Sequence, residues 1–280
     1  MADMIPKKKV GLFITCLVDL LRPSVGMASL KLLENAQQNG LNFSVLVPKQ
    51  QLCCGQPAYN GGDRLAAQKM ARTTLALFES FDYVVIPSGS CAGMIKCHYP
   101  LLLADDPKWG ERAEKLAARV YELTQFLHDL CDAPKTSAES NHDKDLGKIA
   151  YHCSCSSLRE MKVKDQPVAL LQQYVGKDAG IAVETLPDFA TCCGFGGLFS
   201  VKFPDISAAM ADAKIAECQA MGADLLVACD LGCLLHLGGR MGRTAETRDI
   251  PGTKPIEVRH IAEILADNDS DSSLNPRSSR

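Results

Sequence analysis

The sequence predicts an α/β fold made of two pseudo-symmetric, duplicated halves, each a small, mostly parallel sheet flanked by helices. Short apolar runs alternate with helical stretches along the chain, which is typical of parallel α/β layers. Runs such as residues 10–15 (VGLFIT) are almost continuously apolar, as expected for strands covered on both faces. A pattern of four cysteines occurs twice in register along the 280 residues, which indicates a duplicated unit.

The first half contains three expected strands, followed by helical stretches. Asp63 is the expected N-cap of the second helix, because its carboxylate can accept hydrogen bonds from the free N–H groups of the first turn. Residues 87–91 are expected to form a loop after the third strand. The last helical stretch has no obvious counterpart in the second half. The expected strands are residues 10–15, 43–47 and 83–86, and the expected helices are residues 24–38, 64–80 and 109–130.

The second half repeats this plan after a polar segment. Pro167 should break or restart its first helix, since proline has no N–H group for the helical hydrogen-bond ladder. The expected strands are residues 149–152, 181–186 and 224–228, and the expected helices are residues 157–174, 205–221 and 255–266. The expected boundaries are a first domain at 1–130, a linker at 131–148, a second domain at 149–266 and a disordered tail at 267–280.

The duplicated pattern is one cysteine, then an adjacent pair followed by glycine, then another cysteine. In both halves 36 residues separate the first cysteine from the pair, and the offset between the halves is 139 residues at both positions. The last cysteine follows the pair after 36 residues in the first half and after 39 in the second. The cysteines in register are Cys16, Cys53, Cys54 and Cys91 in the first half, and Cys155, Cys192, Cys193 and Cys233 in the second.

These positions predict two groups of four thiolates. Each cysteine lies at or after the carboxyl end of an expected strand, and this edge of an α/β sheet is where ligands bind. Four thiolates suit a tetrahedral zinc ion or an iron–sulfur cluster. The glycine after each pair allows close approach of the backbone to such a group and exposes N–H donors. Among the other cysteines, Cys218 is expected in the core, Cys97 and Cys131 are not expected as ligands, and Cys153 and Cys229 are possible extra ligands or neighbouring thiols.

Composition excludes several other functions. The net charge of −3 does not favour nucleic-acid binding, and no apolar run approaches the length of a membrane span. The apolar stretch after the three N-terminal lysines is too short for a signal peptide, so we expect a cytoplasmic protein. Thirteen cysteines in that compartment favour metal or redox chemistry over structural disulfides. No strand is followed by the GxGxxG fingerprint of dinucleotide binding.

The cysteine pattern resembles the cysteine-rich CCG domain found in the heterodisulfide reductases and in the glycolate oxidase iron–sulfur subunit. The local sequences are most similar to the family of lactate-utilisation A proteins: LCCGQPAYNGGD, PSGSCAGMI, YHCSCSSLRE, TCCGFGGLFS and CLLHLGG. The chain has no ferredoxin-type cysteine run, which disfavours the glycolate oxidase subunit. The resemblance implies a cytoplasmic 4Fe–4S protein for electron transport, which acts with two partner proteins in the oxidation of L-lactate to pyruvate.

The sequence departs from the widest family pattern at one position in each half. Met94 and His236 stand where that pattern has a further cysteine, so the fifth thiolate of the unusual clusters in heterodisulfide reductase is absent. This favours one or two ordinary 4Fe–4S clusters and leaves zinc open in one half. His236 is either a nitrogen ligand or hydrogen-bond donor to the cluster, or a surface histidine. The same alternatives hold for His152.

Three functions therefore remain after the sequence is read. The first is a redox subunit of a non-NAD L-lactate dehydrogenase complex, in which His152 and Arg159 are the candidate catalytic base and carboxylate-binding cation. The second is a heterodisulfide-reductase-like thiol–disulfide redox subunit, which the missing fifth cysteine disfavours. The third is a zinc-binding scaffold without a redox role.

Overall fold

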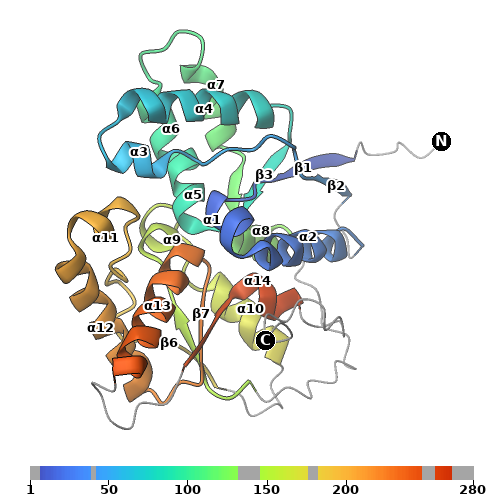
Figure 1. Cartoon of the computed structure of the whole chain (residues 1–280). Helices are drawn as coiled ribbons and strands as arrows, with labels where there is room; N and C mark the ends of the chain where they lie inside the picture. Colours follow the sequence, from blue (N-terminus) through green and yellow to red (C-terminus); the bar gives the residue numbers. More distant parts are fainter. Residues whose placement is uncertain (1–6, 39–41, 132–145, 176–181, 248–255, 267–280) are drawn as a thin grey trace.

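Two four-stranded parallel sheets, one in each half of the chain, form the core of the molecule (Figure 1). The computed structural model describes residues 7–38, 42–131, 146–175, 182–247 and 256–266. The strand order is β2-β1-β3-β4 in the first sheet and β6-β5-β7-β8 in the second, so the two halves share one topology. The predicted fold class is therefore confirmed, with every strand pair of the described residues parallel.

The registers of the two sheets match, and apolar residues dominate the central strands of both. Val10 pairs with Val45 on one side and with Tyr83 on the other, while Ile149 pairs with Val183 and Leu225. The strands are β1 (Lys8–Leu12), β2 (Phe43–Leu46), β3 (Tyr83–Ile86), β4 (Val120–Glu122), β5 (Ile149–His152), β6 (Val183–Thr185), β7 (Leu225–Ala228) and β8 (Glu257–His260).

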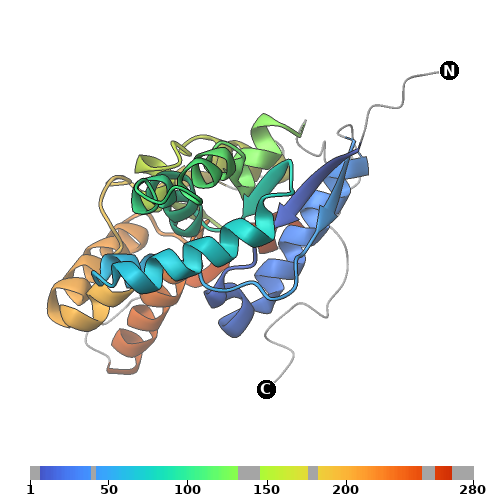
Figure 2. The ribbon, with the colours of Figure 1, turned by 90° about the horizontal axis from the view of Figure 1, so that it is seen from above.

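Helices cover both faces of each sheet, which explains why β3, β5 and β7 are buried along almost their whole length. In the first half α4 and α7 pack on one face and α2 and α8 on the other; in the second half α12 and α13 oppose α10 and α14 (Figures 1 and 2). The first-half helices are α1 (Cys16–Leu21), α2 (Pro23–Gln38), α3 (Gln56–Asn60), α4 (Arg64–Phe78), α5 (Gly89–Gly93), the π-helical turn η1 (Met94–His98), α6 (Tyr99–Leu102), α7 (Gly110–Ala117) and α8 (Leu123–Asp129). The second-half helices are α9 (Cys155–Arg159), α10 (Gln166–Val175), α11 (Leu198–Lys202), α12 (Pro204–Ala220), α13 (Leu231–Thr247) and α14 (Ile261–Ala266).

The fourth strand of each sheet corrects the sequence prediction. Residues 109–130 are not one helical stretch, because β4 separates α7 from α8 and pairs with β3. The expected helix at 255–266 likewise begins with β8, and only its second part is α14. The two strands are equivalent, so residues 109–130 do have a counterpart in the second half. Both strands are too short and polar for period-two alternation to appear, and each passes directly into a helix without a turn residue.

Other predicted elements agree with the structure except near the cysteines. The strands at 83–86 and 149–152 have the predicted bounds, and Asp63 caps α4 by accepting from the N–H of Ala66 at 3.0 Å. Pro167 is the second residue of α10, so it restarts the helix. Residues 87–91 are not wholly a loop, since α5 begins at Gly89, and the first strand ends at Leu12, three residues early. Most of the expected linker (132–145) and the expected tail (267–280) lie outside the described residues.

The two halves pack against each other through equivalent helices. In one contact α2 packs on α14, and in the related contact α10 packs on α8, as expected for a pseudo-twofold arrangement. Arg22 of the first half and Glu263 of the second form an ion pair at 2.9 Å, and Ser24 donates to the same carboxylate at 2.6 Å. A third contact joins α5 to α9 close to the cysteines.

Glu122 is a buried carboxyl at the end of β4, and it makes stability depend on pH. It caps α8 by accepting hydrogen bonds from the N–H groups of Thr124 at 2.8 Å and Gln125 at 3.2 Å. Complete burial is the main reason that its pKa is raised to about 7, with a smaller contribution from Asp230. Between its ordinary pKa near 4.5 and about 7 the unfolded chain releases this proton while the folded chain keeps it.

We expect the free energy of unfolding to fall by about 3 kcal/mol from this group as the pH rises through that window. Urea unfolding of the protein and of Glu122→Gln at several pH values measures it, since glutamine retains an oxygen that can cap the helix. The variant should lose this part of the pH dependence. An identical pH dependence in both proteins would contradict the assignment.

Candidate metal centre

The cysteines of each half gather at the carboxyl ends of the two central strands, from which the chain continues toward opposite edges of the sheet. In the first sheet β1 and β3 are the central neighbours, and the chain leaves their carboxyl ends toward opposite sides. Such a switch point leaves a crevice that is the usual ligand site of an open α/β sheet. Cys16 follows β1 as the first residue of α1, and Cys91 follows β3 within α5. Cys155 and Cys233 hold the equivalent places after β5 and β7.

All eight cysteines in register line one cavity of about 290 Å³ between the two halves. This brings together residues that come from both sheets and lie as much as 217 positions apart, from Cys16 to Cys233. In Figure 1 the helices α1 and α5 of the first half meet α9 and α13 of the second half in the middle of the molecule. The duplication has thus produced two groups of four cysteines that share one cavity.

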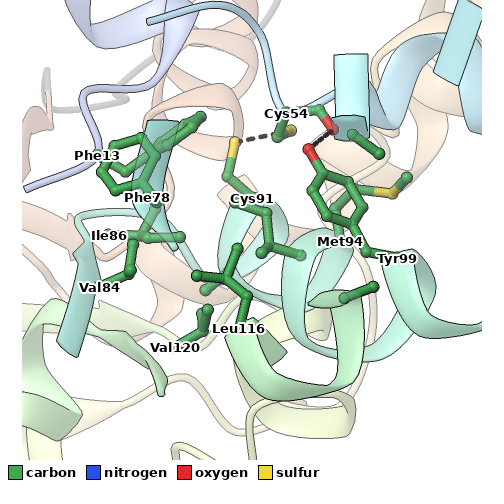
Figure 3. Close-up of a cluster of buried hydrophobic side chains, with 14 of the residues drawn as sticks. Phe13, Cys54, Phe78, Val84, Ile86, Cys91, Met94, Tyr99, Leu116 and Val120 are labelled. Carbon is green, nitrogen blue, oxygen red and sulfur yellow. Dashed lines mark hydrogen bonds between the residues drawn. The ribbon is translucent and has the colours of Figure 1, made fainter. Parts of the chain in front are cut away.

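The first group lies beside the larger core cluster of the first half. The sulfur of Cys54 is 3.3 Å from that of Cys91, and Cys16 and Cys53 line the same cavity. Figure 3 shows Cys54 and Cys91 beside the apolar core, with the hydroxyl of Tyr99 donating to the carbonyl oxygen of Cys54 at 2.8 Å. Cys54 and Cys91 are buried, whereas the other two are half-buried.

The second group has the same arrangement. The sulfurs of Cys193 and Cys233 are 3.0 Å apart, and those of Cys155 and Cys192 are 4.0 Å apart. Cys193 and Cys233 are the buried pair and the other two are half-buried, as in the first half. The two groups are therefore equivalent in burial as well as in sequence register.

The glycine after each cysteine pair is required by the backbone. Gly55 and Gly194 have φ angles of 85° and 90°, a left-handed conformation that side chains disfavour. A Cβ atom on Gly194 would also lie 2.5 Å from the carbonyl oxygen of Ser207. This turn directs the N–H of each glycine toward the first sulfur of its pair, at 3.5 Å from Cys53 and 3.4 Å from Cys192.

The electrostatics of the two groups favour a bound cation. Hydrogen bonds from neighbouring thiols lower the pKa of Cys53 and of Cys192 far below the ordinary thiol value. The same hydrogen bonds raise the pKa of their donors Cys16 and Cys155 well above it. Four thiolates this close together would repel one another, so without a cation each group retains protons. A metal that displaces those protons removes the repulsion.

A buried histidine beside the second group strengthens this conclusion. His152 is completely buried, and within the described residues neither of its ring nitrogens has a hydrogen-bond partner. One ring nitrogen and the sulfurs of Cys193 and Cys233 all lie within 4.8 Å of one another. A buried polar atom without a partner costs about 1–3 kcal/mol. The donor set therefore fits a thiophilic metal ion or an iron–sulfur cluster.

The remaining candidates of the sequence analysis lie outside the cavity lining. Cys153 directs its thiol toward the carbonyl oxygen of Val163 at 3.7 Å, and Cys229 lies 3.2 Å from the hydroxyl of Tyr151. Cys218 is buried in α12, as predicted. The other cysteines outside the lining are Cys97 and Cys131.

His236 and Arg159 have partners of their own. The Nε2 atom of His236 lies 3.1 Å from the hydroxyl of Ser207, which in turn donates to the carbonyl oxygen of Gly194 at 2.8 Å. The exposed guanidinium of Arg159 donates to the carbonyl oxygen of Ala190 at 2.9 Å. Both residues therefore contact the loop around the second cysteine pair rather than the cavity.

Sequence reasoning missed Asp230, which joins the halves at the cavity. Its buried carboxylate accepts hydrogen bonds from the hydroxyls of Ser88 at 2.6 Å and Ser90 at 2.7 Å, and from the hydroxyl of Ser154 of its own half. Ser88 and Asp230 each lie three residues before the last cysteine of their half, a register signal that could have identified them. His98 and Glu160, 3.1 Å apart across the interface, also line the cavity.

The fold and the site together define a duplicated α/β protein with two cysteine groups suited to binding metal. The family of the cysteine-rich domain (CCG) matches residues 10–96 and 149–238, one match in each half. Lactate utilization protein A of Shouchella clausii is 43% identical over 256 residues, which cover 91% of this chain and 98% of that protein. The proteins of the same name from Bacillus licheniformis and Geobacillus kaustophilus are each 44% identical over 257 residues, covering 92% of this chain and 98% of theirs.

The chain therefore belongs to the CCG cysteine-rich family, and within it to the group of lactate utilization protein A. Among the described residues, no helix has both the length and the apolar character of a membrane span.

Proposed function

We propose that this chain is a cytoplasmic iron–sulfur redox subunit that works with two partner proteins in the oxidation of L-lactate to pyruvate. The observation that carries the proposal is the single cavity lined by two complete groups of four cysteines. The names of the relatives, lactate utilization protein A, support the metabolic role. The partners and the compartment are inferred from the family resemblance.

Each group would hold one 4Fe–4S cluster. The ligands would be Cys16, Cys53, Cys54 and Cys91 in the first half and Cys155, Cys192, Cys193 and Cys233 in the second. When bound, such clusters supply one-electron transfer. This chain's own contribution is to exclude water from the two buried cysteines of each group and to direct the N–H groups of Gly55 and Gly194 toward the half-buried sulfurs of Cys53 and Cys192. Hydrogen bonds to the sulfurs and burial are the means by which the chain sets the reduction potentials.

The shared cavity supports a relay between the two centres. Because both groups line the same cavity, electrons would pass between them without crossing the core of either half. The inter-half hydrogen bonds of Asp230 to Ser88 and Ser90 would hold the two centres at a constant separation. The exposed Arg159, by binding the carbonyl oxygen of Ala190, would position the loop before Cys192. Neither of the two candidate catalytic residues, His152 and Arg159, is among the residues that line the cavity, so we assign a catalytic role to neither.

Metal analysis tests the proposal directly. We expect anaerobically purified protein to contain about eight iron and eight acid-labile sulfide per chain, and to give a cluster EPR signal on reduction. Lactate oxidation should then require this chain together with its partners. Stoichiometric zinc with no iron or sulfide would instead establish a zinc scaffold, and about four iron with one zinc would leave a single electron-carrying centre.

A further inference from the structure

A position beside the two cysteine groups carries an apolar residue in the first half and a histidine in the second. His152, the last residue of β5, lies 139 positions after Phe13, the same offset that relates Cys155 to Cys16. In the first half this position is apolar: Phe13 is buried in the core and its ring is 5.5 Å from that of Phe78 (Figure 3). In the second half it carries two nitrogen atoms. The pseudo-symmetry of the cysteines thus does not extend to their surroundings.

His152 also differs from the other fully buried histidine of the described residues. Both ring nitrogens of His260 have partners, since Nε2 donates to the carbonyl oxygen of Cys229 at 2.8 Å and Nδ1 accepts from the N–H of Ala262 at 3.2 Å. Neither nitrogen of His152 has a hydrogen bond of normal geometry, and the ring lies beside the sulfurs of Cys193 and Cys233 instead. A buried imidazole without partners is unfavourable unless a ligand or metal completes its bonding.

The position of the ring is suited to metal binding. One nitrogen of His152 and the sulfurs of Cys193 and Cys233 lie within 4.8 Å of one another, and the two sulfurs are 3.0 Å apart. Tetrahedral ligands at the usual zinc–sulfur and zinc–nitrogen bond lengths lie on the order of 3.5 Å apart, so only small shifts of the side chains are required. Cys155 and Cys192 supply further sulfur donors from the same group.

We propose that His152 ligates the metal of the second centre through a ring nitrogen and takes the place of one of the four cysteine sulfurs assigned to that centre above, so that this centre has a mixed nitrogen and sulfur donor set while the first has sulfur alone. The inference rests on the proposed metal site but not on the role in lactate oxidation. It applies to a zinc ion or to an iron of a cluster, which share this ligand chemistry. A neutral imidazole adds no negative charge, and histidine ligation raises the potential of an iron–sulfur centre. With iron bound, the second centre is therefore the electron acceptor of the pair.

Cobalt binding to the metal-free protein tests the ligand directly. Co²⁺ alone is titrated anaerobically into the metal-free protein and into His152→Phe, which places in the second half the residue of the first. We expect the variant to bind one of two Co²⁺ ions at least about 100-fold more weakly. Loss of a residue that only hydrogen-bonds a metal ligand lowers affinity by about 10- to 100-fold, so a direct ligand should cost at least the upper value. X-ray absorption of the loaded protein should show imidazole scattering that the variant lacks.

A stability measurement distinguishes a ligand from a merely structural residue. Because phenylalanine leaves no unpaired buried nitrogen, the metal-free His152→Phe protein should unfold at a higher urea concentration than the unaltered one. A variant that binds metal less well although it is more stable has lost a ligand and not its fold. His236→Asn is the matched control and should retain the imidazole scattering, since His236 already binds Ser207.

Two results would overturn the inference: imidazole scattering that persists in His152→Phe or disappears in His236→Asn, or a loss of Co²⁺ affinity below about 10-fold in His152→Phe. Iron and sulfide analysis separates this failure from failure of the proposed function. If the protein contains no iron but its Co²⁺ site depends on His152, the redox role is contradicted and His152 is supported as a ligand. If the protein contains two iron–sulfur clusters but His152→Phe keeps full Co²⁺ affinity, the redox role is supported and His152 is not a ligand.

Discussion

Replacing Cys54 with serine should remove the metal from the first centre and leave the second loaded. The sulfur of Cys54 is buried 3.3 Å from that of Cys91, so its loss takes away one of four donors in a site that water cannot easily fill. A serine hydroxyl is a poor ligand because metal ligands must be deprotonated. We expect iron and sulfide per chain to fall by about half. Metal analysis and EPR of anaerobically purified protein measure both quantities.

The two halves and a distant cysteine provide controls for this result. Cys193→Ser should empty the second centre instead and leave the EPR signal of the first. Cys218→Ala removes a buried thiol from α12 that does not line the cavity, so its metal content should match that of the unaltered protein. Full iron content in Cys54→Ser, or equal losses in Cys54→Ser and Cys218→Ala, would contradict the assignment of ligands.

Replacing Gly89 with valine should force the two halves apart at the cavity. Gly89 begins α5 and lies against Ser157 of α9, and a Cβ atom there would be 1.9 Å from the hydroxyl oxygen and 2.8 Å from the backbone nitrogen of Ser157. The backbone of α9 cannot move aside without displacing Cys155, while α5 carries Cys91. We expect the free energy of unfolding to fall by about 3 kcal/mol or more, the upper end for overpacking, together with loss of metal from both centres.

Urea unfolding and metal analysis of the same preparations test this contact. Gly242→Val is the matched control, because Gly242 lies in α13 and a Cβ atom at that position would meet no neighbouring heavy atom within 4 Å. Its stability should change by less than about 0.5 kcal/mol, and its metal content should not change. If Gly89→Val were as stable and as metal-rich as the control, the close contact of α5 with α9 would not hold the halves together.

Local patterns were sufficient for much of the fold. The strands at 83–86 and 149–152 were predicted at their bounds because they are apolar runs between clear turn signals. The strands β4 and β8 were missed because a three- or four-residue edge strand that leads straight into a helix has no period of its own. β4 and β8 are strands only because they pair with β3 and β7, and such pairing is a long-range contact that the local sequence does not show.

The sequence by itself determined the duplication, the parallel sheets and the eight cysteines, because spacing and apolar runs are properties of neighbouring residues. Only the tertiary structure decided that both groups share one cavity, that Asp230 binds serines of the other half, and that His152 alone among the two fully buried histidines of the described residues lacks partners. These facts depend on how equivalent helices of the halves pack together. Residues some 140 positions apart meet there, and no local pattern records which side chains face each other across that interface.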